Sequence, residues 1–206
     1  IDTSPDIKKQ MLDNGINRLS AIIYTHEHAD QTAGIFEMRP FFWINKKKIN
    51  VYGNLRTIKK LIKSYTFCFY PRSGYKPIMT HKIINKKFTI KGRKKIIKIT
   101  PFEVSHGMIK ATGYLFNKIA YISDCNGIPK KSFKYLKGLD FLIVDCLREE
   151  KHPSHFNYKD AIDLTHKIRP KKTILTNLHV DLDYETLRRK LPKNIIPAYD
   201  GLCFNF

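Results

Sequence analysis

The chain has 206 residues, a length that suits one domain with a substantial buried core, and we expect a single domain over residues 1–206. Its 38 Lys and Arg against 18 Asp and Glu give a formal net charge of +20. No apolar run reaches the roughly 18 residues of a membrane helix and no signal peptide is evident, so the sequence argues against a membrane partner.

The first half of the chain is predicted to alternate helices and strands. Ser4 would cap a helix that Pro5 begins and Gly15 ends. The apolar residues 19–25 are typical of a buried strand. The next predicted elements are a short helix at 32–38, a strand at 49–52, a helix at 54–65, a loop at 66–80 and a strand at 82–90.

The second half is predicted to contain strands first and then strands separated by helices. Asn157 would cap one helix, which ends before Pro170, and Asp183 would cap another. The predicted strands lie at 95–104, 112–116, 119–123, 141–145, 174–177 and 195–199, and the predicted helices at 130–136, 158–168 and 184–190. This order predicts the α/β class.

A cluster of potential metal ligands follows the predicted strand at 19–25. In an extended loop, residues two apart point to the same side, so His26 and His28 can face one metal ion while Asp30 reaches a second position. Imidazole and carboxylate groups together suit zinc, manganese or iron. Two nearby histidines also occur in loops by chance, so the cluster alone does not establish a site.

Three distant residues strengthen the metal hypothesis. His106, Asp124 and His179 each follow a strand-like segment. An α/β scaffold brings such strand ends together, so we expect these residues to contribute to one site.

This ordered set resembles the metallo-β-lactamase superfamily of hydrolases, and the resemblance covers nearly the whole chain. Asp2 is similar to the structural aspartate of the first motif, and residues 26–31 are similar to the second motif. His106, Asp124 and His179 are similar to the third, fourth and fifth. The resemblance implies a four-layer αββα sandwich, with N-terminal strands and a Gly-rich turn that would precede this sequence.

Shorter motifs resemble one branch of the superfamily. They are Arg72-Ser73-Gly74-Tyr75, His152-Pro153-Ser154-His155 and the segment 176–184. They are similar to the branch that contains the cyclic-phosphate phosphodiesterase of the carbon–phosphorus lyase pathway and the tRNase Z enzymes.

The resemblance implies a centre of up to two zinc or manganese ions. His26, His28 and His106 would bind the first ion, Asp30 and His179 the second, and Asp124 would bridge them. Two such ions can share a hydroxide that attacks phosphorus, and Asp30 would also orient it.

The resemblance further implies a proton donor for the leaving group. His155 is our candidate general acid, with His152 as a weaker one. The alternative is that both are surface histidines in a polar loop.

Gln31 departs from the family pattern, which has a histidine at this position. An amide oxygen is a neutral, weak ligand, so the second ion would bind weakly or would be a harder ion such as manganese. Loss of catalysis is the alternative, and the other intact ligands argue against it.

The four cysteines form no C-x-x-C pair and no disulfide framework, which favours a reducing, cytoplasmic location. Cys146 and Cys203 lie in apolar contexts and are predicted core thiols. Cys125 follows Asp124 directly, and we expect it not to be a ligand because Asp124 fills the matching place.

The segment 65–76 interleaves aromatic and basic residues. Its aromatic side chains could stack on a base while Arg72 pairs with a phosphate, or the segment could be a lid or the contact of a homodimer.

The leading functional hypothesis is a metal-dependent phosphodiesterase acting on a small cyclic or nucleotide-like phosphate. A thioester or lactam hydrolase and a tRNA-processing nuclease are alternatives of the same fold, although the nuclease usually carries a long arm that is not evident. A further alternative, which the high charge supports, is a non-catalytic metal-binding or nucleic-acid-binding module. Because the lysines are scattered among Ile and Asn residues, an A/T-rich genome is itself a sufficient cause of that charge.

Overall fold

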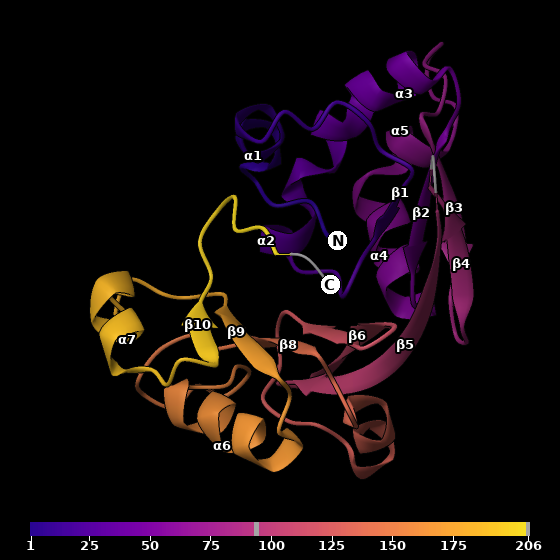
Figure 1. Cartoon of the computed structure of the whole chain (residues 1–206). Coiled ribbons are helices and arrows are strands. Elements are labelled where there is room, and N and C mark those ends of the chain that lie inside the picture. The colour runs from indigo at the N-terminus through magenta and orange to yellow at the C-terminus, as the bar shows by residue number, and fades with distance from the viewer. Residues whose placement is uncertain (93–94, 205–206) are drawn as a thin grey trace. The chain divides into compact units, whose positions relative to one another are not determined.

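The structure is a computed structural model that describes residues 1–92 and 95–204 (Figure 1). The chain divides into two compact units, Ile1–Lys98 and Ile99–Phe206, and each is described by itself. The expectation of one domain over residues 1–206 stays a prediction.

The first unit is built on a parallel sheet in the order β1-β2-β3. Alternate residues of β2 are buried, and β2 lies between its two partners because its Ile and Val side chains suit a central strand. The strands are β1 (Ala21–Ile23), β2 (Ile49–Gly53) and β3 (Met79–Ile83). The helices are α1 (Ile7–Asp13), α2 (Ala29–Thr32), the 3-10 helix η1 (Ala33–Met38), α3 (Arg39–Asn45), α4 (Leu55–Ser64) and α5 (Thr66–Phe69).

Helix α4 packs against β2 and β3 and closes one face of this sheet. The Asn54 side chain caps the helix by accepting a hydrogen bond from the backbone N–H of Thr57 (2.9 Å). Ile58 and Leu61 are buried in the core of the unit, whereas Leu55 in the first turn is 49% exposed. Leu55 therefore lies outside the buried face of α4.

Several predicted elements of the first unit are corrected. The N-cap of α1 is Asp6 and not Ser4, because the Ser4 hydroxyl donates to the Gln10 side chain (2.8 Å). The predicted loop at 66–80 contains α5 and the start of β3, and α3, which has Pro40 in its first turn, was not predicted. The predicted strand at 82–90 is in fact β3 and a separate strand β4 (Phe88–Lys91).

The second unit is built on a mixed sheet in which most strands run the same way. In the strand order β10-β9-β8-β7-β6-β5, β6 is antiparallel to both β5 and β7, and β7 to β10 are parallel. Strand β5 begins in the first unit, where β4 is the next strand in the order. The strands are β5 (Ile96–His106), β6 (Ile109–Phe116), β7 (Ile119–Ile122), β8 (Phe141–Asp145), β9 (Lys172–Thr176) and β10 (Ile195–Pro197).

The helices of the second unit cover this sheet (Figure 1). They are the 3-10 helix η2 (Lys130–Leu136), α6 (Tyr158–Ile168) and α7 (Tyr184–Lys190), with α6 packed on β8 and α7 on β10. Both predicted caps are confirmed: Asn157 accepts from the N–H of Asp160 (2.9 Å), and Asp183 accepts from the N–H of Thr186 (2.8 Å). The α/β class is therefore confirmed.

Two further observations concern membranes and cysteines. Within residues 1–92 and 95–204, no helix has the length and apolar character needed to cross a membrane.

Cys146 is buried as predicted, but the prediction of a core position for Cys203 is wrong. Cys203 lies in the exposed segment beyond β10, where its Sγ is 3.4 Å from the Gly201 carbonyl.

Candidate metal centre

The loop that follows β1 is anchored by a buried carboxylate. The Asp2 side chain accepts hydrogen bonds from the backbone N–H (2.8 Å) and the hydroxyl (2.9 Å) of Thr25. The backbone N–H of Asp2 donates to the Ile23 carbonyl (2.8 Å) at the end of β1. Asp2 thus has the structural role that the resemblance implies for the first motif.

This anchor fixes the protonation of His26, which is fully buried. The Thr25 hydroxyl has a single proton and donates it to Asp2, so its oxygen acts as an acceptor toward His26 Nδ1 at 3.0 Å. The His26 proton therefore lies on Nδ1, and Nε2 is the nitrogen that would bind a metal. Carboxylate, hydroxyl and imidazole form a chain of the kind that orients metal ligands.

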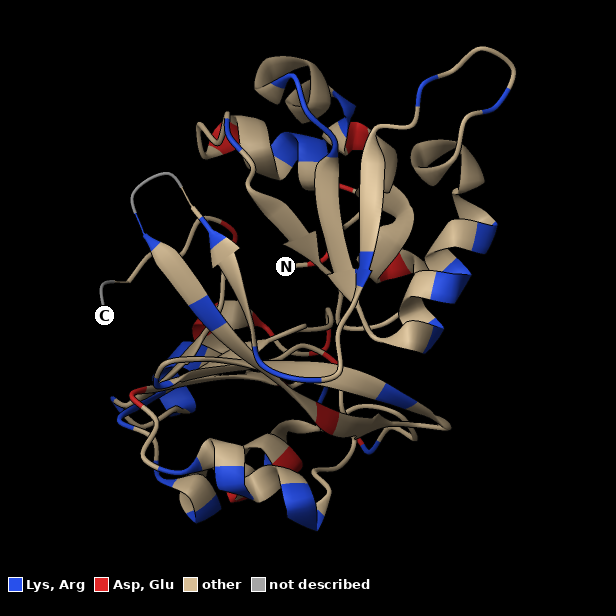
Figure 2. Cartoon of the chain, turned by 90° about the vertical axis from the view of Figure 1, so that its right-hand side faces the viewer, with Lys and Arg blue, Asp and Glu red and all other residues tan. Residues whose placement is uncertain are grey.

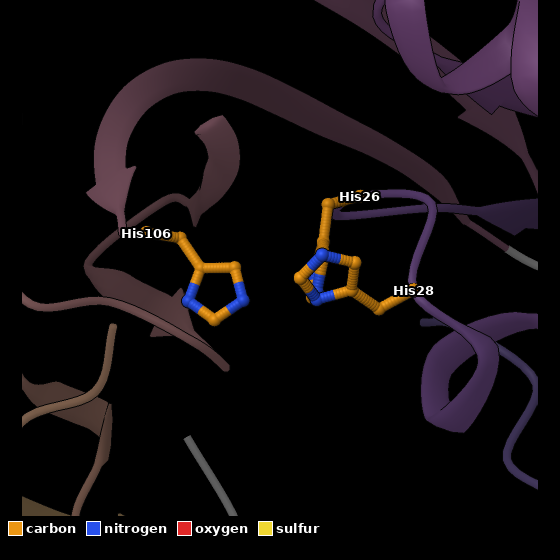
Figure 3. Close-up of side chains that lie close together, drawn as sticks. All are labelled: His26, His28 and His106. Atoms are coloured by element: carbon orange, nitrogen blue, oxygen red, sulfur yellow. The ribbon is translucent and has the colours of Figure 1, made fainter. Parts of the chain in front are cut away.

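His28, Asp30 and Gln31 lie at the more exposed end of the same loop. The His28 ring meets the His26 ring edge to face, with 4.6 Å between centroids (Figure 3). Asp30 is exposed in the first turn of α2. The Gln31 side-chain amide donates to Asp30 Oδ2 (2.9 Å). Gln31 therefore contacts the carboxylate that the sequence motif predicts for the second metal.

In the second unit, the direction of the strands brings chemical groups to one edge of the sheet. Strands β5, β7, β8 and β9 run the same way, so their carboxyl ends share that edge. His106 ends β5, Asp124 lies two residues beyond β7, and Asp145 ends β8. All three side chains are buried, with at most 2% exposed.

His106 is held by the loop that contains residues 152–155. Its Nδ1 donates to the Ser154 carbonyl (2.7 Å), which leaves Nε2 directed to within 3.9 Å of Asp124 Oδ2. Gly107, at φ +57°, allows this approach, because a Cβ there would lie 3.0 Å from the Ser154 side chain. Figure 3 shows His106 at the end of its strand.

His155 joins His106 and Asp124 in one cluster. One ligand atom from each of the three residues lies within 4.8 Å of the others. His155 Nδ1 is 2.9 Å from Asp145 Oδ2, and Asp145 also accepts from the Asn177 side-chain amide (3.0 Å) and the Cys125 N–H (2.9 Å). A buried, multiply bonded carboxylate therefore orients this imidazole.

His179 lies outside this cluster. Its side chain is 50% exposed, with Nδ1 3.2 Å from Asp181. Its backbone N–H donates to the Leu147 carbonyl (2.8 Å), which fixes the loop after β9 but not the ring. Among the described residues of the second unit, the potential ligand group contains His155 in the place expected for His179.

Cys125 is a poor candidate for a metal ligand, and His152 is a poor candidate for a general acid. Burial, together with the carboxylates of Asp145 and Asp124, raises the pKa of the Cys125 thiol well above its usual value. Burial and the nearby charges of His155 and Arg148 lower the pKa of His152. A thiol that stays protonated binds metal weakly, and a neutral imidazole is a poor proton donor.

Sequence reasoning missed the groups that orient these imidazoles. Asp145 could have been found, because a carboxylate that ends a fully apolar strand is an unusual choice for a buried position. The Ser154 carbonyl could not, since a backbone acceptor leaves no signal in residue type.

The donor set fits a transition metal. In the second unit, the imidazoles of His106 and His155, each engaged through Nδ1, lie beside the buried Asp124 carboxylate, and such groups are ligands that zinc and manganese accept. Without a cation, grouping these polar side chains in the interior would be costly.

Comparison with known proteins agrees with this chemistry. The model of the β-lactamase superfamily domain matches residues 1–178. The crystal structure of a diphosphatase from the PhnP family is 33% identical, with a TM-score of 0.87, over 98% of this chain and 76% of that chain. Short-form human tRNase Z shares the fold at 16% identity, with a TM-score of 0.69 over 98% of this chain and 85% of that chain.

A curated relative is also similar, the octanoyltransferase of Porphyromonas gingivalis strain W83, at 29% identity over 205 residues. The match covers 98% of this chain and 41% of that protein, so the chain spans about two fifths of the curated relative it matches.

The chain therefore belongs to the β-lactamase superfamily and, within it, to the PhnP family. It has the metallo-β-lactamase fold, and that fold implies divalent metal ions.

The first prediction concerns the anchor of His26. Thr25→Val keeps the side-chain shape but removes the hydroxyl between Asp2 and His26. We expect metal affinity to fall about 10- to 100-fold, because the imidazole loses the group that orients it. Isothermal titration with zinc measures this. Thr80→Val is the matched control, since the Thr80 hydroxyl bonds Asn50 between strands, and an equal loss in both variants would contradict the role of Thr25.

The second prediction concerns Gln31. Zinc titration should show two unequal steps, because a neutral amide supports the second ion less than imidazole does. Gln31→His should tighten the weaker step and leave the stronger one unchanged. If both steps stay unchanged, Gln31 does not face the metal and serves only to hold Asp30.

Proposed function

We propose that this superfamily member is a metal-dependent phosphodiesterase that acts on a small cyclic or nucleotide-like phosphate. The observation that carries the proposal is the cluster of His155, His106 and Asp124, with His155 bonded to the buried Asp145. The 33% identity to a PhnP-family diphosphatase supports a phosphate substrate.

We further propose that up to two zinc or manganese ions are bound by the residues of the sequence motifs. These are His26, His28, Asp30, His106, Asp124 and His179. When bound, such ions lower the pKa of water and stabilise negative charge on a phosphoryl oxygen. His26 and His106 are buried and would hold the first ion tightly. Asp30 and His179 are more exposed and suit a second ion that is held more weakly.

His155 would act as the general acid. Its Nδ1–H donates to Asp145, so Nε2 is the atom that can transfer a proton to the leaving oxygen. Asp145 is then a positioning residue, since its oxygens are engaged by His155, Asn177 and Cys125. Asp30 would orient the attacking water.

The location of His155 within ligand distance of His106 and Asp124 gives a specific alternative. A histidine whose Nδ1 donates to a carboxylate is also the usual form of a metal-binding imidazole. In that case His155 would be a ligand, and the metal content of a variant distinguishes the two roles.

A thioester substrate is the second candidate function. The relative named octanoyltransferase favours acyl chemistry. That name, however, describes a longer protein, and the match to this chain covers only 41% of it. The name therefore does not say that acyl transfer is carried out by the part of the relative that this chain resembles.

The partners follow from charge and composition. A small phosphodiester is the proposed substrate, with nucleic acid and a homodimer as further proposals, and the cytoplasm is the proposed location. Figure 2 shows Lys and Arg on many elements of both units and not on one element alone. A scattered positive field attracts small anions as well as nucleic acid.

The experiment that tests the function is a substrate screen with added zinc or manganese. Bis-p-nitrophenyl phosphate, cyclic nucleotides, a dinucleotide with a diphosphate bridge and an acyl thioester are compared. We expect metal-dependent cleavage of the phosphates alone. Cleavage of the thioester alone, or salt-dependent RNA binding with no turnover, would contradict the proposal.

The third prediction separates ligand from acid. We expect His28→Ala to abolish phosphodiester hydrolysis and lower metal content. His155→Ala should keep its metal and lower kcat about 10²–10⁴-fold, as removal of a positioned acid does. His166→Ala, on the exposed face of α6, is the control and should change neither. Loss of metal in the His155 variant would make His155 a ligand.

A further inference from the structure

The first unit contains a cavity that the proposed metal chemistry does not use. Its volume is about 690 Å³, within the range of sites for small molecules. None of the residues that line it is a proposed metal ligand or the proposed acid. It is formed by η1, α3, α5 and the segment before β3, so it lies entirely within this unit.

Aromatic side chains dominate the lining. They are Phe36, Phe42, Trp43, Phe67 and Tyr75. Trp43 is 61% exposed and Tyr75 is 68% exposed. Phe36 meets Phe67 edge to face at 5.4 Å between centroids, and Phe42 meets Trp43 in the same way at 5.0 Å. Large aromatic groups gathered around a hollow, and not buried in the core, indicate a surface that binds a flat partner.

The polar part of the lining is positive. Arg39 and Lys76 line the cavity, and the Arg39 guanidinium lies 5.7 Å from the centre of the Phe36 ring. Among the described residues that form the wall, none is acidic. A flat ligand could therefore stack on the aromatic rings while an attached anion pairs with the two cations.

We propose that this cavity binds a nucleoside monophosphate, with the base stacked on the aromatic rings and the phosphate held by Arg39 and Lys76. The aromatic and basic pattern at 65–76 supplies Phe67, Tyr75 and Lys76 to the wall. Arg72, the residue first suggested for phosphate, does not line it. The proposal concerns a second binding site and does not rest on the hydrolase function.

Trp43 is a built-in probe, because it is the single tryptophan of the chain. AMP, adenosine and ribose 5-phosphate are titrated into the full chain while Trp43 emission is recorded. We expect AMP to quench the emission with saturation, and adenosine and ribose 5-phosphate each to bind at least tenfold more weakly because one half of the recognition is missing. No saturable change with AMP would overturn the proposal.

Variants locate the binding. Phe67→Ala and Arg39→Gln should each weaken AMP binding about tenfold, whereas Arg18→Gln, which removes an exposed cation elsewhere in the unit, should not. If Arg39→Gln and Arg18→Gln weaken AMP binding equally, AMP is attracted by the overall positive charge of the chain and not by this cavity, and the proposal is overturned. His28→Ala should bind AMP as the unaltered chain does, and loss of the signal in this variant would place AMP at the metal centre.

The oligomeric state gives the last control. Sedimentation of the same samples should show one species with and without AMP. If sedimentation instead shows a dimer that dissociates when AMP is added, the change in Trp43 emission reports that dissociation. The occupant of the cavity is then a second copy of the chain, and the nucleotide proposal is overturned.

Discussion

The central constraint in this structure is that three imidazoles, those of His26, His106 and His155, are already committed through Nδ1. His26 donates to Thr25, His106 to the Ser154 carbonyl and His155 to Asp145. An imidazole has only two nitrogens, so fixing the proton on one fixes the other as the atom that faces a ligand. These contacts stabilise ring orientations that flexible side chains would not otherwise keep. The metal chemistry depends on them, because a ligand that must first be ordered binds more weakly.

The backbone then decides which of these groups can meet. In the second unit, strands β5, β7 and β8 run in one direction, so His106, Asp124 and Asp145 share a sheet edge although 18 and 21 residues separate them in sequence. In the first unit, β1 delivers the His26 loop, and Asp2 ties that loop to the start of the chain. Strong backbone pairing therefore supports a polar site, and neither unit needs the site's residues for its own apolar core.

Much of this arrangement could be predicted from the sequence, and the exceptions have physical reasons. Apolar runs gave strand β8 and helices α6 and α7 with their correct bounds, because period and caps are local signals. Helix α3 was missed because its Phe and Trp side chains favour strands as much as helices. The ligand motifs were found from spacing, but the neighbours of His155 were not, since Asp145 and Asn177 meet it only through the register of β8 and β9.

The geometry of both units implies that imidazole nitrogens and carboxylates bind the metal and that cysteine does not. The most direct measurement is X-ray absorption at the zinc edge of the full chain loaded with zinc. We expect a shell of nitrogen and oxygen at about 2.0–2.1 Å with imidazole scattering from at least two histidines. A sulfur shell at about 2.3 Å, which would bring Cys125 into the site, or a spectrum without imidazole scattering, would contradict it.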